Sequence, residues 1–168
     1  QRRECKAVSA RRALFLDRDG TIIKNVENLD DPEQVELLPG AAERIKSANE
    51  AGWFVIVVTN QACVNRGDVA VSQVEAVHKR MIQLLEAEGA GINHITLCPH
   101  TPEQECFCRK PKPGMLYAAA TVFQLDLRDC YLVGDQLTDL LAAKAVRMPC
   151  YKVEHGLGDW DIRQLERL

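Results

Sequence analysis

The sequence predicts an α/β fold built on a doubly wound parallel sheet with helices on both faces. Short apolar segments of strand length alternate along the chain with longer segments of helical periodicity. Residues 53–58, Trp-Phe-Val-Ile-Val-Val, are apolar at every position, as expected of a strand that is covered on both faces. Polar and acidic residues follow several of these apolar segments, which is where open parallel sheets bind their ligands.

Four strand–helix pairs account for most of the chain. The first member of each pair is a short apolar run, and the second carries its apolar residues at helical spacing. In chain order, the pairs are residues 13–16 and 41–50, 53–58 and 71–88, 95–97 and 115–123, and 131–133 and 137–146. Residues 24–39 are polar, end in Leu-Pro-Gly, and are predicted to form a loop long enough to cover a site.

Length and composition indicate one soluble globular domain spanning residues 1–168. The net charge of -3 argues against general binding to nucleic acids or membranes. The N-terminus is locally basic and is interpreted as a solvated tail; its basic residues are Arg2, Arg3, Lys6, Arg11 and Arg12. No apolar run approaches the roughly 20 residues of a membrane span, so we expect a cytoplasmic protein, and we expect a monomer. The 7 cysteines are an odd number, which favours free thiols or metal ligands over disulfides.

Acidic residues follow two of the predicted strands. Asp17 and Asp19 come directly after the first strand, and Asp135 follows the strand at 131–133. Alone, Asp-x-Asp-Gly is more often a turn, but a parallel sheet would bring Asp135 beside the other two acids. Three converging carboxylates require a cation, and oxygen ligands select a hard ion such as Mg²⁺.

Donor side chains lie at the other predicted strand ends. Thr59 and Asn60 supply a hydroxyl and an amide, and Lys110 supplies an ammonium group. Together with a metal ion, these groups describe a cradle for a phosphoryl group.

Four segments carry a resemblance to a known family. Phe-Leu-Asp-Arg-Asp-Gly-Thr, Val-Thr-Asn-Gln, the region of Lys110, and Val-Gly-Asp-Gln-x-x-Asp resemble, in order, the motifs of the haloacid-dehalogenase-like (HAD) phosphatases, which have a Rossmann-like sheet. The resemblance covers essentially the whole chain. It implies that Asp17 is a nucleophile that forms an aspartyl-phosphate, and that Asp19 protonates the leaving oxygen and then activates water.

The resemblance also implies roles for the remaining motif residues. Thr59 and Lys110 would bind the phosphoryl oxygens, and Asp135 would hold Mg²⁺ together with Asp17 and the main-chain carbonyl of Asp19. A carboxylate bound to Mg²⁺ stays ionised, whereas one just outside the ion's ligands can carry a proton, so two similar acids divide the work.

A second metal site is predicted in a loop at about 98–108. Cys98, His100, Cys106 and Cys108 are four ligands suited to a tetrahedral, structural Zn²⁺. The alternative is four unrelated residues on a surface loop. A bound Zn²⁺ would brace the chain that leads into Arg109 and Lys110.

The cysteine loop and its continuation resemble the small, nearly capless members of the family, the heptose 1,7-bisphosphate and histidinol-phosphate phosphatases. The segments Thr-Asn-Gln-x-x-x-x-Arg-Gly, Asp-Pro-Glu before Leu-Pro-Gly, and Lys-Pro-x-Pro-Gly-Met favour the heptose group. The short cysteine loop favours the histidinol group. The resemblance thus implies a magnesium-dependent phosphomonoesterase whose expected substrate is a heptose 1,7-bisphosphate, with histidinol phosphate as the alternative. The chain departs from the heptose pattern at Ala62, Cys63 and Gln136.

Four residues are predicted to contact the substrate, which would be a small phosphorylated molecule: Asn60, Gln61, Arg66 and Arg109. Arg109 is expected to reach a second anionic group, since a guanidinium fork fits phosphate or carboxylate oxygens. Two alternatives come from other classes of protein. A receiver-like phospho-switch would also group aspartates and a lysine at strand ends, and a zinc-stabilised interaction module would leave the acidic site silent.

Overall fold

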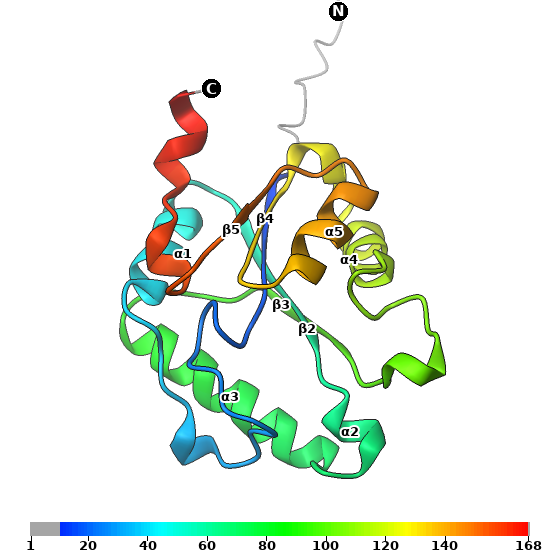
Figure 1. The fold of residues 1–168 in the computed structure, drawn as a ribbon. Coiled ribbons are helices and arrows are strands. Elements are labelled where there is room, and N and C mark those ends of the chain that lie inside the picture. Colours follow the sequence, from blue (N-terminus) through cyan, green and yellow to red (C-terminus); the bar gives the residue numbers. More distant parts are fainter. Residues whose placement is uncertain (1–10, 168) are drawn as a thin grey trace, which may run out of the picture.

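The computed structural model describes residues 11–167, in which five parallel strands form one sheet (Figure 1). The strands are β1 (Ala13–Leu16), β2 (Phe54–Asn60), β3 (His94–Cys98), β4 (Tyr131–Gly134) and β5 (Cys150–Lys152). Their order across the sheet is β3-β2-β1-β4-β5, so the direction of winding reverses between β1 and β4. The predicted doubly wound α/β fold is confirmed, and its switch point marks the expected place for a ligand.

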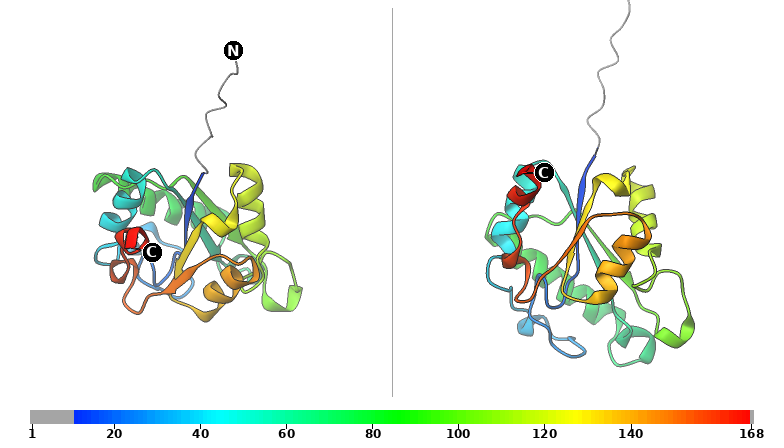
Figure 2. Two further views of the ribbon diagram at one scale, coloured as in Figure 1. Left: turned by 90° about the horizontal axis from the view of Figure 1, so that it is seen from above. Right: turned by 45° about the horizontal axis from the view of Figure 1, so that its top comes forward.

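Helices cover both faces of the sheet, as Figure 2 shows. The helices are α1 (Ala41–Glu50), α2 (Cys63–Arg66), α3 (Val71–Ala87), α4 (Gly114–Phe123) and α5 (Leu137–Ala145). Leu14 and Leu16 of β1 belong to one buried cluster, which also contains residues of α1 and α3. Phe15 belongs to a second cluster, which contains residues of α4 and α5. Side chains that alternate along β1 therefore fill both layers of the core.

The eight predicted elements are present; β1 and α1 have the predicted ends, and the ends of the other six differ by at most two residues. The largest shift is in β2, which begins at Phe54 rather than Trp53 and continues through Thr59 and Asn60. Neither β5 nor the short helix α2 was predicted. The predicted loop at 24–39 contains only one 3₁₀ turn, Pro32–Gln34, among its described elements.

Two sequence-based expectations concern the ends of the chain and the membrane. The basic residues Arg2, Arg3 and Lys6 and the thiol of Cys5 lie outside the described residues. Within residues 11–167, no helix has the length and apolarity needed to cross a membrane.

Strand register brings the polar strand ends to one edge. Leu16 pairs with Val57 on one side and with Val133 on the other. The next residue, Asp17, donates its backbone N–H to the Val133 carbonyl at 3.2 Å. Asp17 therefore lies at the carboxyl edge of the central strand, beside the ends of β2 and β4.

Candidate active site

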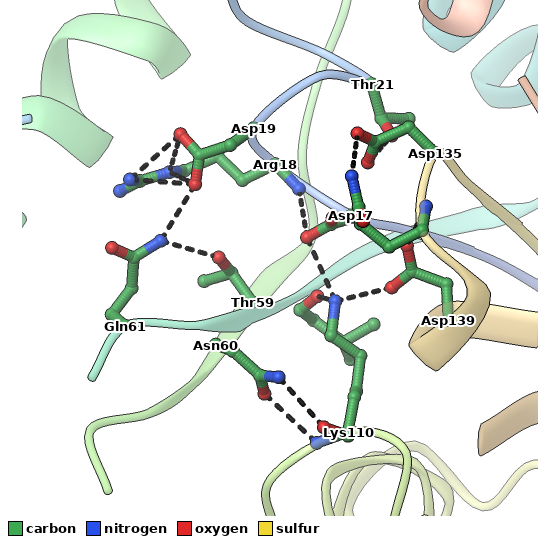
Figure 3. Close-up of polar contacts among 12 residues, drawn as sticks. Asp17, Arg18, Asp19, Thr21, Thr59, Asn60, Gln61, Lys110, Asp135 and Asp139 are labelled. Atoms are coloured by element: carbon green, nitrogen blue, oxygen red, sulfur yellow. Dashed lines mark hydrogen bonds and ion pairs between the residues drawn. The ribbon is translucent and has the colours of Figure 1, made fainter. Parts of the chain in front are cut away.

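Lys110 lies at the centre of the candidate site and is buried. Its Nζ donates to Asp17 Oδ1 at 2.9 Å, to Asp139 Oδ1 at 2.6 Å and to the Val58 carbonyl at 2.8 Å (Figure 3). All three donor positions of the ammonium are thus used. This network ties the loop after the cysteine cluster to the ends of β1 and β2 and to α5.

Burial and the ion pairs shift the pKa values of Lys110 and its two acidic partners. Burial raises the pKa of Asp17, and the ion pair with Lys110 opposes that rise. Burial likewise raises the pKa of Asp139 to about 6, with Asp17 adding to the rise and Lys110 opposing it. For Lys110, burial lowers the pKa, but Asp17 and Asp139 outweigh it and leave the pKa above its ordinary value. Lys110 is therefore a fixed positive charge at neutral pH.

Asp135 completes an acidic group that fits a divalent cation. One carboxylate oxygen from each of Asp17, Asp135 and Asp139 lies within 4.8 Å of the others. Three carboxylates outnumber the single ammonium, and hard oxygen donors are the ligands that Mg²⁺ prefers. Lys110 bonds one oxygen of Asp17 and one of Asp139, and the other oxygen of Asp139 accepts from the Gln136 N–H at 3.1 Å. Asp135 and the second carboxylate oxygen of Asp17 are therefore left to face a cation. Asp17 and Asp135 are the two side chains predicted to bind Mg²⁺, and the structure brings them together.

Gly20 allows Asp135 to approach. Gly20 has a φ of +78°, and a Cβ there would lie 2.2 Å from Asp135 Oδ2. Thr21 Oγ1 donates to Asp135 Oδ1 at 3.4 Å, and Gln136 Nε2 donates to Oδ2 at 2.9 Å. The turn after β1 thus serves two purposes: it lets the chain leave the strand, and it leaves space for a second acid.

Asp19 points toward a different set of partners (Figure 3). The guanidinium of the buried Arg18 donates to the Asp19 carboxylate through Nε at 3.1 and 3.2 Å and through Nη2 at 3.1 Å. Gln61 Nε2 donates to Asp19 Oδ2 at 2.9 Å. Asp19 is therefore held apart from the Lys110 network, although it lines the same cavity as Asp17.

The side chains at the end of β2 hold other site residues. Asn60 bonds the backbone of Lys110 twice, accepting from its N–H at 3.0 Å and donating to its carbonyl at 3.1 Å. Gln61 Nε2 also donates to Thr59 Oγ1 at 2.8 Å, which leaves the Thr59 hydroxyl proton available for a phosphoryl oxygen. Asn60 and Gln61 were predicted to contact substrate. Asn60 lines the cavity that contains Asp17 and Gln61 lines only the adjoining one, and these bonds engage both side chains with neighbouring site residues.

Two adjoining cavities share Asp19, Asn25, Asn60 and Arg109. The inner cavity, about 360 Å³, contains Asp17, Lys110 and Asp135. The outer one, about 220 Å³, contains Arg66. Both predicted arginines thus border the site, although Arg66 also pairs with Asp68 at 3.1 Å.

The four predicted zinc ligands form a compact cluster. Cys108 Sγ lies 3.3 Å from Cys98 Sγ, 3.5 Å from Cys106 Sγ and 3.2 Å from His100 Nδ1. A tetrahedron with metal–sulfur bonds of about 2.3 Å has edges of roughly 3.8 Å, so these separations fit one tetrahedral ion. The alternative of four unrelated residues does not explain their convergence.

The cysteine cluster is connected to the residues predicted to bind phosphate. Arg109 donates its backbone N–H to Cys106 Sγ at 3.3 Å and its Nη1 to the His100 carbonyl at 3.2 Å. A metal ion in the cluster would thereby fix the chain that delivers Arg109 and Lys110.

Three residues that contact the site residues were not assigned to the site from the sequence. Asp139 is the last residue of the Val-Gly-Asp-Gln-x-x-Asp motif, but its pairing with Lys110 was not predicted. Its place one helical turn after Asp135 was the available signal. Arg18 carried no signal, because arginine beside two acids is ordinary at a solvated turn. His78 of α3 was not assigned to the site from the sequence, and in the structure its Nε2 lies 3.1 Å from Arg18 Nη1.

An acidic group, a buried lysine and a donor set at the switch point of a doubly wound sheet define a phosphoryl-transfer site of the HAD class. Residues 107–164 match the family model described as HAD-hydrolase-like. The chain belongs to this family, and its similarity to curated phosphatases extends over most of its length. It is 40% identical over 160 residues to the D-glycero-beta-D-manno-heptose-1,7-bisphosphate 7-phosphatase of Pseudomonas putida, covering 92% of this chain and 87% of that protein.

Two further relatives agree. The enzyme of the same name from Rhodopseudomonas palustris is 36% identical over 151 residues, covering 86% of this chain and 84% of that protein. A crystal structure of D,D-heptose 1,7-bisphosphate phosphatase from B. bronchiseptica, complexed with magnesium and phosphate, superposes with a TM-score of 0.81 at 33% identity. It covers 92% of this chain and 86% of that chain. The predicted family resemblance is confirmed.

Proposed function

We propose that this protein is a magnesium-dependent phosphomonoesterase that removes the phosphate at carbon 7 of D-glycero-D-manno-heptose 1,7-bisphosphate. The observation that carries the proposal is the buried Asp17–Lys110–Asp139 network beside Asp135, with Asp19 lining the same cavity. It unites a nucleophile, a fixed cation, a cation-binding acid and a separate acid/base group.

The chemistry divides among these residues. Asp17 attacks phosphorus, an Oδ–P bond forms, and the bond from phosphorus to the substrate oxygen breaks. Asp19 gives its proton to the departing oxygen, then takes one from the water that hydrolyses the aspartyl-phosphate. Lys110 and the Thr59 hydroxyl would meet the charge on the phosphoryl oxygens.

Asp17, Asp135 and the carbonyl of Asp19 would hold Mg²⁺. When bound, the ion supplies positive charge that balances the phosphoryl group and keeps Asp17 ionised. The acidic excess of the site supports this assignment, as does the magnesium-bound relative from B. bronchiseptica.

Zn²⁺ is proposed as the ion of the cluster formed by Cys98, His100, Cys106 and Cys108. Four protein ligands leave no position for water or substrate, so the ion would be structural. Its contribution to activity would be indirect, through the placement of Arg109 and Lys110.

The two cavities support a bisphosphate substrate. A phosphate in the inner cavity would meet Lys110, while the outer cavity offers Arg66, and Arg109 borders both. A second phosphate held by these guanidinium groups would orient the sugar between the cavities.

Histidinol phosphate is the second candidate, and the short cysteine loop is the feature that favours it. A receiver-like switch is disfavoured because Asp19 offers an acid/base that would destabilise a long-lived phospho-aspartate. A silent interaction module is disfavoured because all the expected acids are intact. A cytoplasmic monomer that binds neither nucleic acid nor membrane, and one domain over residues 1–168, stay predictions from the sequence.

A substrate panel tests the proposal. Phosphate release is measured from heptose 1,7-bisphosphate and from histidinol phosphate, each with and without added Mg²⁺. We expect magnesium-dependent turnover with kcat/KM at least tenfold higher for the heptose. Preference for histidinol phosphate would overturn the substrate, and activity independent of divalent metal would overturn the mechanism.

A further inference from the structure

Arg18 is the largest charged side chain within the buried part of the site. Arg18 is only 1% exposed, yet its side chain neither faces Lys110 nor belongs to the acidic group around Asp135. A buried guanidinium needs partners for its donors. The partners found are Asp19 on one side and His78 of α3 on the other.

The contact with Asp19 fixes the orientation of a carboxylate. Nε lies 3.2 Å from Asp19 Oδ1 and 3.1 Å from Oδ2, and Nη2 lies 3.1 Å from each oxygen. A planar fork that meets both oxygens sets the plane of the carboxylate, which a lysine ammonium cannot do. Gln61 completes this set of donors at Oδ2.

The contact with His78 fixes the position of the Arg18 guanidinium. His78 Nε2 lies 3.1 Å from Arg18 Nη1, which can only donate, so Nε2 is the acceptor and this imidazole is neutral. Burial and the neighbouring guanidinium lower the pKa of His78 to about 4, which agrees with that protonation state. The imidazole therefore accepts a bond from Arg18 without adding a second buried positive charge.

We propose that Arg18 and His78 are positioning residues that orient Asp19 for proton transfer, with His78 fixing the guanidinium and the guanidinium fixing the carboxylate. Neither residue touches the reacting phosphoryl group in this proposal. As Asp19 loses its proton to the departing oxygen, the new carboxylate stays paired with Arg18, which remains charged throughout. The proposal rests on the phosphatase activity of the site but not on the identity of the sugar.

Leaving-group dependence separates positioning from simple structural support. An alkoxide leaving from a sugar phosphate needs a proton, whereas the nitrophenolate of p-nitrophenyl phosphate leaves readily without one. Because kcat/KM reports the steps up to phosphoryl transfer, a misplaced Asp19 lowers kcat/KM for the sugar phosphate and largely spares the aryl substrate.

The experiment compares His78→Leu, which removes the acceptor, with His78→Gln, whose amide oxygen can replace it. We expect His78→Leu to lower kcat/KM about tenfold for heptose 1,7-bisphosphate and less than about threefold for p-nitrophenyl phosphate. His78→Gln should stay within about twofold of wild type on both. Equal losses on the two substrates, or equal behaviour of the two variants, would overturn the proposal.

Arg18→Lys provides a second variant that keeps the buried charge and loses the fork. It should show the same selective loss on the sugar phosphate, and a uniform loss would count against positioning. If wild type hydrolyses p-nitrophenyl phosphate but not the heptose, the proposed substrate fails on its own. The comparison then uses D-fructose 1,6-bisphosphate as the alkyl phosphate, and the same outcomes decide it.

Discussion

Individual residues in this site are held by one another as much as by the fold. The Lys110 side chain bonds Asp17 and Asp139, and the Asn60 side chain, at the end of β2, bonds the Lys110 backbone. A lysine side chain has several rotatable bonds, so such anchoring removes freedom that would otherwise be lost when the phosphoryl group binds. Asp139 bonds Lys110 but has no chemical step of its own in the proposed reaction.

Replacing Asp139 with asparagine tests this anchoring. The change removes one of the two carboxylates that bond Lys110, so the ammonium is less firmly placed against the phosphoryl group. We expect kcat to fall roughly ten- to hundredfold while KM changes much less. Steady-state kinetics with Asp129→Asn, an exposed acid preceding β4, as control would show the difference; an unchanged kcat would contradict the anchoring role.

His78 gives a prediction for stability against pH. Its pKa is about 4 in the folded protein, below the ordinary value of 6.5, so the unfolded chain binds more protons between these values. Stability from this group is complete above pH 6.5 and is lost as pH falls toward 4. Urea unfolding at pH 7.5 and 5.5 should show about 1 kcal/mol more loss for wild type than for His78→Gln. Parallel losses would contradict the depressed pKa.

The sequence predicted the residues of the proposed chemistry more completely than the residues that hold them. Asp17, Asp19, Thr59, Lys110 and Asp135 belong to motifs at strand ends, and a parallel sheet converges such ends by geometry. Contacts such as Arg18 to His78 depend on the packing of α3 against the turn after β1. Local sequence does not encode that packing, so these partners could only be seen in three dimensions.

At the scale of elements, the cysteine loop connects β3 to the segment that carries Arg109. Cys98 ends β3, and the other three predicted ligands fold back onto it through a turn at Pro102–Gln104. A loop with so little regular structure has few backbone bonds of its own, so metal ligation would supply much of its order.

Cys108→Ser tests the metal-braced loop. We expect wild type to contain about one Zn²⁺ per chain and the variant to lose most of it, because one tetrahedral ligand is weakened. Unfolding stability should fall by several kcal/mol, and activity should fall with it as Arg109 and Lys110 lose their support. The measurements are metal analysis and thermal unfolding.

Cys150→Ser is the matched control, since Cys150 lies on β5, away from the cluster. It should retain the metal. Equal zinc content in the Cys108 and Cys150 variants would contradict the proposed ligand set.

Elements with long apolar or periodic stretches were predictable, and short ones were not. The strand β5 has only 3 residues, two of them exposed, so it lacks the apolar run that indicates a strand. The helix α2 has 4 residues and forms where the chain departs from the family pattern at Ala62 and Cys63. Tertiary pairing, with β4 in the first case, decides such segments.

At the scale of the whole molecule, one sheet order accounts for the position of the site. The reversal between β1 and β4 opens the carboxyl edge where Asp17 and Asp135 meet, and β2 adds Thr59 on the other side of β1. The segment between β1 and β2 adds a loop and α1, which agrees with the nearly capless architecture expected. On this account, substrate choice depends on the side chains around the two cavities. The positions of these side chains are harder to infer from sequence than the fold.

The central claim is that Asp17 is the nucleophile, and Asp17→Asn tests it most directly. Phosphate release from heptose 1,7-bisphosphate is measured with saturating Mg²⁺ for wild type and variant, after thermal unfolding shows that both are folded. Because an amide cannot form the aspartyl-phosphate, the rate should fall at least about a thousandfold. A variant rate within tenfold of wild type would contradict the assignment.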